Sequence, residues 1–545
     1  MVAAAGAAQV ARAHATLEDG RALLLGGEGK RAAAVFDGLR GAPWLSAWTE
    51  AGGRLSLAFL GHDPGGTVGA DARAYFGSSH LLEVAARKAP LEGQRVLASL
   101  LERSGERLAA LPLAAFDLDA GRDEDARRRA AADPAAFEGR GLGREVIAVL
   151  RLREAGARSI VRDRAGRRLG HLAGDGWLWL ADDVEKALVP EAVRSALQAA
   201  PFTPGLRVSL DLALSGLALH ALGPARGSVV LLDPKTGGVL AAVSDALTLS
   251  RMGGTPAFEE RREPASVAKV ITTAAALRAG IDPDAFIRRL DCRGPERFGK
   301  GILWCSYPAG PLLGLDQAMA ISCNMAFAHL GLAAGRAVLV DEFHRWGFDR
   351  DFAIAPAGRV VQPAGDERQL ADLAIGLEAT DITPLHGALL GAVLADGGRM
   401  PEPVVLEAEE GPMGLEPRPM PRPAARDVVD SAMIPVLARA MLAVATRGTA
   451  SGMAPLDFPV AMKTGTGAEW RRGYHANYVG VAPWPDPVVA FSVRITYGPT
   501  SAQVNQTARA VLGQLLDGLR RHHRLRARMG VARRRGTAPL PAAGL

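Results

Sequence analysis

Apolar residues recur at helical spacing through the first 157 residues, as Leu97, Leu100, Leu101 and Leu108 illustrate. This stretch is rich in Ala, Leu, Arg and Glu, and it has no repeat period clear enough to indicate a solenoid. We therefore expect residues 1–157 to form a mainly helical region, whose role the sequence does not indicate.

The pattern becomes strand-like after residue 157. Residues 158–172 predict short extended segments around a turn at Ala165-Gly166, within a short linker of residues 158–205. Further on, the apolar runs 228–232 and 239–243 flank a turn that contains Pro and Gly, which is typical of a β-hairpin.

The rest of the chain alternates helical and strand-like stretches. Pro264 and Gly280 are start and stop signals for a helix that ends near Arg278. Residues 401–425 are crowded with Pro and predict a surface loop. We expect further helices and strands at 316–335 (helix), 460–465, 476–482 and 488–495 (strands) and 502–520 (helix). This order predicts an α+β fold over residues 206–520, with helices packed on an antiparallel sheet.

Composition agrees with a folded chain of several domains. The 545 residues have a mass of 57.0 kDa, with 48% hydrophobic and 22% charged residues, which excludes a mainly disordered chain. No apolar run reaches the ~18 residues of a membrane span. The N-terminus has no basic segment followed by an apolar core, so we expect no signal peptide.

The net charge of +6 comes from the C-terminus. Eight arginines and no acidic residue lie between Arg520 and Leu545, so the rest of the chain is slightly acidic. We therefore expect residues 521–545 to be a basic, disordered tail, and we expect no nucleic-acid partner.

The three cysteines are Cys292, Cys305 and Cys323. Their spacing fits no zinc pattern, so we expect neither a metal site nor a cofactor. Cys292 and Cys305 could form a disulfide in an oxidising compartment, and the alternative is that they are free buried thiols.

Ser266 and Lys269 form an S-x-x-K motif at the start of the predicted helix. Positions i and i+3 share one face of a helix, so the amine lies beside the hydroxyl. Serine needs a base to become a good nucleophile, and lysine can be that base when burial lowers its pKa. The chain has only seven lysines, so arginine is its ordinary cation and a lysine carries more information.

Two further motifs follow in the chain. Ser322 and Asn324 form S-x-N, which can relay a proton and hold a substrate carbonyl; a helix or turn cap is the alternative interpretation. Lys463, Thr464, Gly465 and Thr466 lie on a predicted strand, where a cation and hydroxyls can bind a carboxylate and glycine permits close approach. A second K-T-G at 235–237 falls in the predicted hairpin turn, and we interpret it as a decoy.

The three motifs in this order resemble the transpeptidase domain of penicillin-binding proteins. Composition alone would give the triple about once in a thousand such chains. The resemblance covers residues 206–520 well, 158–172 faintly and 1–157 not at all. Supporting segments are 207–211, 228–241, 374–376, 382–385, 448–450, 478–483 and the short motif 162–166, which is similar to one in class B members.

The resemblance implies a penicillin-binding, acyl-serine D-Ala-D-Ala transpeptidase that cross-links peptidoglycan stem peptides in cell-wall synthesis and is inhibited by β-lactams. Ser266 would be the nucleophile and Lys269 its base, while Ser322 and Asn324 would assist proton transfer and hold the donor peptide. Lys463, Thr464, Gly465 and Thr466 would bind the terminal carboxylate. The backbone N–H groups of Ser266 and Thr466 would form the oxyanion hole.

The sequence also departs from the family. The usual P-G-S-T-x-K appears as Pro264-Ala-Ser-Val-Ala-Lys269, and Gly467-Ala-Glu469 is unusual after the third motif. The family's membrane anchor and long pedestal are not visible, so either the anchor lies upstream of an unrecognised start or the protein is unanchored. From the family we expect membrane association and a location in the cell envelope, on the periplasmic side, with cell-wall synthesis partners contacting residues 1–157.

Two alternative functions remain at this stage. A serine DD-carboxypeptidase or β-lactamase shares the acylation step and uses water as the acceptor. A class A β-lactamase needs a deacylating glutamate in an E-x-x-L-N-like loop, and the segment that begins at Glu378 lacks the Asn. The other alternative is a penicillin sensor or scaffold with little turnover.

Overall fold

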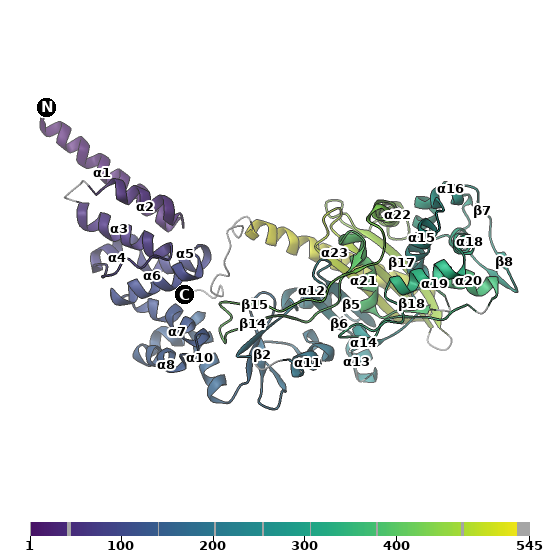
Figure 1. Cartoon of the computed structure of the whole chain (residues 1–545), viewed down its shortest axis with the longest axis horizontal. Helices are drawn as coiled ribbons and strands as arrows, with labels where there is room; N and C mark the ends of the chain where they lie inside the picture. Colours follow the sequence, from purple (N-terminus) through teal and green to yellow (C-terminus); the bar gives the residue numbers. More distant parts are fainter. Residues whose placement is uncertain are drawn as a thin grey trace.

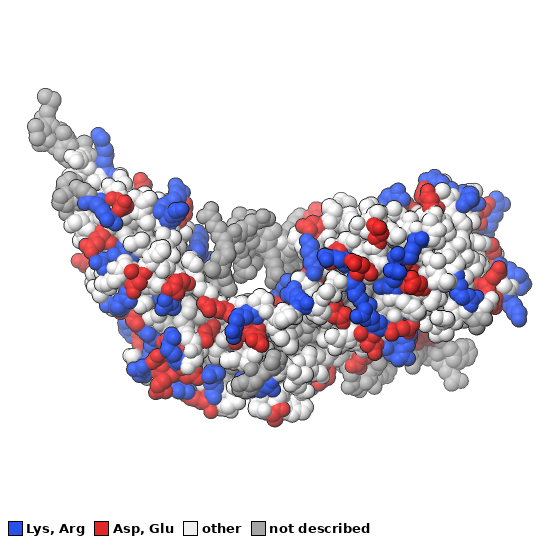
Figure 2. Space-filling model, in the orientation of Figure 1, with Lys and Arg blue, Asp and Glu red and all other residues white. Residues whose placement is uncertain are grey.

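The helical N-terminal region and the sheet-containing remainder of the chain lie at opposite ends of an elongated molecule (Figure 1). The computed structural model describes residues 2–40, 45–139, 141–200, 203–252, 255–305, 307–363, 365–377, 380–469 and 473–530. None of the helices in these ranges combines the length and apolar character needed to cross a membrane. The face shown in Figure 2 carries acidic and basic side chains intermixed.

The N-terminal region is helical, as predicted, and it has two hydrophobic cores. Leu24, Phe36 and Leu97 belong to the first core, and Leu118 and Val146 belong to the second. The helices are α1 (Val2–Leu25), α2 (Gly29–Gly38), α3 (Ser46–Phe59), α4 (Ala70–Phe76), α5 (Ser78–Lys88), α6 (Leu91–Arg103), η2 (Arg107–Ala109), α7 (Ala110–Asp119), α8 (Asp123–Ala132), α9 (Pro134–Glu138) and α10 (Leu142–Glu154).

A six-stranded sheet follows the N-terminal helices. Its strand order is β15-β14-β4-β1-β2-β3. The strands are β1 (Ser159–Arg162), β2 (Arg168–Leu172), β3 (Leu178–Leu180), β4 (Gly205–Val208), β14 (Leu406–Glu410) and β15 (Arg418–Pro419), with η3 (Lys186–Leu188) and α11 (Glu191–Gln198) before β4. The predicted linker therefore contributes β1, β2 and β3 to a sheet that also contains β14, more than 200 residues further along the chain.

The prediction of a surface loop at 401–425 is wrong. Strand β14 lies in a stretch without proline and pairs antiparallel with β4, while the proline-containing β15 is an edge strand. An edge strand tolerates proline because one side of its backbone needs no partner in the sheet. Helix α7 holds the turn between these strands, since Asp119 accepts hydrogen bonds from the backbone N–H groups of Met413 and Leu415, the latter at 2.7 Å.

The larger sheet is five-stranded and antiparallel, in the order β17-β18-β19-β5-β6. Its strands are β5 (Gly227–Leu232), β6 (Val239–Ser244), β17 (Ala461–Glu469), β18 (Gly473–Ala482) and β19 (Val489–Gly498). The predicted hairpin and the three predicted strands are confirmed, although the strands are longer than expected. Strand β5 also pairs with β19, so the hairpin β5–β6 joins a sheet whose other strands lie far along the chain.

Helices cover both faces of this sheet. Val229 and Leu231 point into a core shared with α12 (Leu212–Leu222) and α23 (Ser501–Gly530), whereas Val230 and Leu232 point into a core shared with α21 (Pro384–Ala395). This alternation follows from the two-residue period of a strand. Helix α23 continues ten residues beyond the predicted end at Arg520, and residues 531–545 of the expected tail lie outside the described residues.

The remaining elements lie between residues 246 and 447 and are mostly helices. They are α13 (Ala246–Met252), α14 (Pro256–Glu259), η4 (Ala265–Ala268), α15 (Lys269–Arg278), α16 (Pro283–Ile287), β7 (Asp291–Cys292), β8 (Glu296–Phe298), β9 (Gly301–Leu303), β10 (Gly310–Pro311), α17 (Leu315–Ala320), α18 (Asn324–Ala334), α19 (Arg336–Arg345), β11 (Arg359–Val360), α20 (Glu367–Ile375), β12 (Thr380–Asp381), β13 (Arg399–Met400), β16 (Arg426–Asp427), η5 (Ser431–Met433) and α22 (Ile434–Arg447). The predicted helix at 316–335 is thus two helices, separated at residues 321–323.

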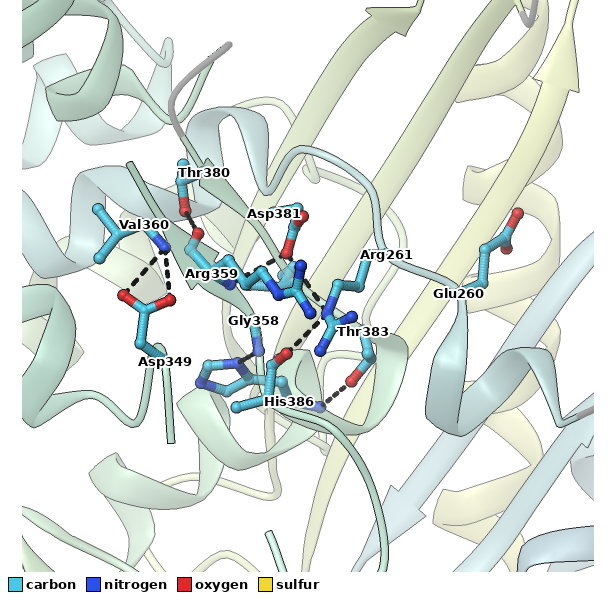
Figure 3. A network of polar contacts seen from close by, with 12 residues as sticks. Glu260, Arg261, Asp349, Gly358, Arg359, Val360, Thr380, Asp381, Thr383 and His386 are labelled. Carbon is cyan, nitrogen blue, oxygen red and sulfur yellow. Dashed lines mark hydrogen bonds and ion pairs between the residues drawn. The ribbon is translucent and has the colours of Figure 1, made fainter. Parts of the chain in front are cut away.

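A polar network fastens β11 beside α21 (Figure 3). The buried ring of His386 accepts a hydrogen bond from the Gly358 backbone N–H at 2.8 Å through Nδ1 and contacts the Trp346 carbonyl at 2.8 Å through Nε2. Only the neutral ring with its proton on Nε2 satisfies both contacts. Burial accordingly lowers the pKa of His386 to about 4.

Candidate active site

The predicted nucleophile and base meet at the start of a helix. Ser266 lies in the 3₁₀ turn η4, and Lys269 is the first residue of α15. The Lys269 amine donates a hydrogen bond of 2.9 Å to the Ser266 hydroxyl. The lysine is fully buried and the serine is half-buried, so the hydroxyl is the group of this pair that a substrate can reach.

The second motif lies where α17 and α18 separate. Ser322 has a left-handed backbone (φ 56°), and Cys323 caps α18 by accepting a hydrogen bond from the Ala326 N–H. This reversal turns the motif toward Lys269, whose amine donates to the Ser322 carbonyl at 2.8 Å and to the Asn324 side-chain oxygen at 2.7 Å. Asn324 in turn donates to the Trp304 carbonyl at 2.7 Å.

The third motif brings a second buried lysine to the same hydroxyl. Lys463 on β17 donates to the Ser322 hydroxyl at 2.9 Å, and Lys269 approaches that oxygen at 3.2 Å. Among the described residues, no carboxylate is among the groups that shift the pKa of either amine. The structure therefore brings the three predicted motifs together around Ser322.

Burial controls the protonation of both amines. It lowers the pKa of Lys269 to about 8, which places the neutral amine within reach of mildly alkaline pH. Burial and the neighbouring Lys269 cation hold the pKa of Lys463 well below its usual range. Two amines around one hydroxyl disfavour double protonation, because like charges at this separation repel in a site that excludes water.

Close backbone approach shapes the turn that carries Ser266. Ala265 adopts φ 49°, a conformation that favours glycine, and its N–H donates to the Gly376 carbonyl at 2.9 Å. A Cβ on Gly376 would lie 2.2 Å from the Ala265 carbonyl oxygen, and one on Gly465 would lie 2.5 Å from the Pro264 carbonyl oxygen. The two glycines thus let α20 and β17 pack directly against the nucleophile's turn.

These residues open into a cleft of about 990 Å³. Its lining includes residues of all three motifs, namely Ser266, Ser322, Asn324, Thr464 and Thr466. The Thr464 and Thr449 hydroxyls lie 2.6 Å apart. Helix α23 also contributes to the cleft, with Asn505 and Arg509.

Sequence reasoning missed Asn505. Its side-chain nitrogen donates to the Thr466 hydroxyl at 2.9 Å, and its oxygen accepts from the Tyr478 hydroxyl at 3.0 Å. The chain has only three asparagines; Asn324 and Asn505 line the cleft, and Asn477 donates to the carbonyl of Glu263, another lining residue. The rarity of asparagine was a usable signal for these positions.

Other residues singled out in the sequence lie elsewhere. Lys235 of the second K-T-G lies in the β5–β6 turn, where it pairs with Asp486 at 3.4 Å outside the cleft. Glu378 lies outside the described residues. All three cysteines are free thiols, so the Cys292–Cys305 disulfide is not formed in this structure.

Comparison with known sequences gives a consistent result. A family model of the penicillin binding protein transpeptidase domain matches residues 227–517, more than half of the chain. Peptidoglycan D,D-transpeptidase PbpA of Mycolicibacterium smegmatis is 31% identical over 318 residues, which cover 51% of this chain and 63% of that protein. Peptidoglycan D,D-transpeptidase MrdA of Acinetobacter baumannii is 25% identical over 370 residues, which cover 56% and 53%. The chain spans less than two thirds of the length of these relatives.

Solved structures share the fold. PBPA from Mycobacterium tuberculosis matches with a TM-score of 0.55 at 22% identity, over 66% of this chain and all of that one. The D,D-transpeptidase domain of a peptidoglycan glycosyltransferase from Eggerthella lenta matches with a TM-score of 0.57 at 21% identity, over 68% of this chain and 99% of the other. The predicted α+β fold with an antiparallel sheet is confirmed.

Proposed function

The chain belongs to the penicillin-binding protein transpeptidase family, and on that premise we propose that it is an acyl-serine D,D-transpeptidase that cross-links peptidoglycan stem peptides. The curated relatives PbpA and MrdA are named peptidoglycan D,D-transpeptidases. The observation that carries the proposal is the 2.9 Å contact between the buried Lys269 amine and the Ser266 hydroxyl.

In the first step, Lys269 acts as the base. The Ser322 carbonyl and the Asn324 oxygen accept two hydrogens of the neutral amine, which directs its lone pair to the Ser266 hydroxyl. The amine takes the hydroxyl proton as the oxygen attacks the carbonyl of the penultimate D-Ala. The bond to the terminal D-Ala breaks, and that residue leaves as its free amine after receiving a proton.

Ser322 is suited to carry protons between the two lysines and the leaving group. Its hydroxyl lies 3.2 Å from the Lys269 amine and 2.9 Å from the Lys463 amine. An amine of a neighbouring stem then attacks the acyl-enzyme, which releases the cross-linked peptide and restores the Ser266 hydroxyl.

The third motif binds the donor's terminal carboxylate in this proposal. Thr464 and Thr466 line the cleft and offer hydroxyls, and the Lys463 amine lies behind them, where it donates to the Ser322 hydroxyl. Gly465 lets β17 approach the turn of Ser266, so the backbone N–H groups of Ser266 and Thr466 are suited to stabilise the oxyanion.

Labelling with a fluorescent penicillin tests the proposal. We expect a covalent band on the full chain, no band on Ser266→Ala, and an unchanged band on Ser501→Ala, which removes another hydroxyl of the same cleft. A folded wild-type protein that neither labels nor hydrolyses the penicillin would overturn the proposal.

The fate of the acyl group separates the related activities. A transpeptidase keeps the penicilloyl group for long periods and forms a cross-linked product when a D-Ala-D-Ala peptide and an amine acceptor are supplied. Rapid loss of label would identify a β-lactamase, and release of D-Ala without cross-linking would identify a carboxypeptidase.

The cellular setting follows from the substrate. Peptidoglycan stems lie outside the cytoplasmic membrane, so we propose a location in the cell envelope, on the periplasmic side. Residues 1–157 form a helical surface separate from the cleft, and we propose that they contact other cell-wall synthesis proteins. Retention of such a protein by the full chain, and its loss on substitution of exposed residues in α1–α10, would test this role.

A further inference from the structure

The three cysteines of the chain converge in the folded protein, although 13 and 18 residues separate them in sequence. Cys292 lies in β7, Cys305 follows β9, and Cys323 caps α18. Their sulfur atoms all lie within 4.8 Å of one another, and all three residues are buried. Among the residues that the structure describes, they form the one group of three His, Cys, Asp or Glu side chains with such close ligand atoms.

We propose that Cys292, Cys305 and Cys323 bind one thiophilic divalent cation of the zinc class. Zinc binds thiolate sulfur at about 2.3 Å, so two sulfurs of a tetrahedral site lie about 3.8 Å apart. The Cys305 and Cys323 sulfurs are 3.6 Å apart, close to this edge length. Small side-chain movements therefore convert the cluster into three sulfur ligands, with a fourth position left for water or a small ligand.

A metal ion fits this arrangement better than a disulfide. A disulfide needs two sulfurs at about 2.0 Å, which requires a much larger approach of the nearest pair. It would also leave the third buried thiol unused. A cation uses all three sulfurs, and binding releases their three protons to solvent.

The site would act on the neighbouring second motif through positioning. Cys323 lies between Ser322 and Asn324, and Cys305 follows Trp304, whose carbonyl accepts the Asn324 hydrogen bond at 2.7 Å. An ion bound to both cysteines would fix the two backbone segments that hold Asn324. The inference concerns metal binding and holds whether or not the proposed transpeptidase activity is confirmed.

The test uses the full chain, purified with a reductant, stripped with a chelator and titrated with Zn²⁺ and with Co²⁺. We expect one equivalent of metal by elemental analysis and a sulfur-to-cobalt charge-transfer band in the near ultraviolet. With Zn²⁺ at a thousand times its Kd, we expect Tm to rise by about 5 °C. Serine variants at each cysteine are expected to lose the charge-transfer band and the Tm shift.

His329→Gln is the matched control. His329 lies on α18 but is hydrogen-bonded to Glu296 at 2.7 Å and is not part of the cluster, so this variant should bind metal as the wild type does. Circular dichroism first checks that each serine variant is folded, and the chelator titration of the wild type provides a result that does not depend on the variants. Two results would overturn the proposal. One is a reduced protein with three titratable thiols that binds no stoichiometric metal. The other is a purified protein whose intact mass is lower by two hydrogens, which indicates a disulfide, and which binds no metal once that disulfide is reduced.

Discussion

The amine of Lys463 donates a hydrogen bond of 2.9 Å to the hydroxyl of Ser322, so the third motif directly supports the second. Removing it with Lys463→Ala leaves this hydroxyl without its closest partner. Because loss of the partner of a buried polar group costs about 1–3 kcal/mol, we expect penicillin acylation to slow about 5- to 150-fold. Stopped-flow or gel-based labelling measures this rate.

The second K-T-G supplies the control for this experiment. Lys235→Ala changes the same tripeptide in a hairpin turn outside the cleft, so its acylation rate should equal that of the wild type. Equal rates for both variants would contradict the role of Lys463.

The pH dependence of acylation should report Lys269. Burial lowers its pKa to about 8, and only the neutral amine can take the Ser266 proton. The rate should therefore rise about tenfold per pH unit below 8 and level off above it. Lys269→Arg keeps the charge at every accessible pH and should lower the rate about 10²- to 10⁴-fold. A flat wild-type profile between pH 6 and 9 would argue against Lys269 as the base.

The sequence predicted the site better than its surroundings. S-x-x-K spans the short turn η4 and the first residue of α15, and K-T-G-T lies within β17. Local spacing was therefore enough to place Ser266 beside Lys269 and to place Thr464 and Thr466 on one face of the strand. The contacts to Ser322 depend on its φ of 56° between α17 and α18. No glycine or other residue type in this segment predicts a left-handed backbone there. Asn505 reaches the cleft only because α23 packs against β18 and β19, which is a tertiary contact.

The wrong loop prediction has an identifiable physical cause. The prolines of 401–425 correctly indicated interrupted structure, but β14 lies in a short gap between them and finds its partner β4 about 200 residues earlier. The convergence of the three cysteines could not be predicted from their spacing, because zinc motifs are recognised by local spacing and these thiols are brought together by three separate elements.

Gly376→Ala should disturb the turn of the nucleophile. The new Cβ would lie 2.2 Å from the Ala265 carbonyl oxygen, and φ is 78°. Backbone strain of about 1 kcal/mol and overpacking of about 1–3 kcal/mol together predict a loss of about 2–4 kcal/mol in unfolding free energy. Denaturant titration measures this loss, and penicillin labelling should be impaired as well.

Gly280→Ala separates the two contributions. Gly280 has φ 74° but no atom within 4 Å of an added Cβ, so only the backbone cost of about 1 kcal/mol is expected. If both variants lost the same stability, the close contact between Gly376 and Ala265 would be unimportant.

The free energy of unfolding should decrease as the pH is lowered, because His386 is neutral in the folded state. Its folded pKa of about 4 lies below the unfolded value of about 6.5, so the unfolded state binds the extra proton between these values. The stabilisation is therefore present above pH 6.5 and is lost as the pH falls toward 4, by about 2 kcal/mol between pH 7 and pH 5. His386→Gln can make the same two hydrogen bonds without titrating, so its pH dependence should be weaker by this amount. The unfolding free energy of both proteins is measured by denaturant titration at several pH values. The same change between pH 7 and pH 5 in both proteins would refute the assignment.

Asn505 should position Thr466. Asn505→Ala removes the 2.9 Å hydrogen bond to the Thr466 hydroxyl, and a loss of about 1 kcal/mol predicts roughly a fivefold slower acylation. Combining it with Thr466→Val should cost less than the sum of the single effects, since both remove one contact. Gln514→Ala, an exposed change on the same helix, should have no effect. Additive losses in the double variant would exclude coupling between the two side chains.

The pairing of β5 with β19 has a consequence for synthesis on the ribosome. About 250 residues separate the two strands, so at about 5–20 residues per second the nascent hairpin β5–β6 waits roughly 10–50 s for its partner. During that interval, the edge of β5 is a row of unpaired backbone groups flanked by apolar side chains, which is a template for pairing with other chains. The growing polypeptide is therefore open to pairing with other chains at this edge until residue 498 has emerged.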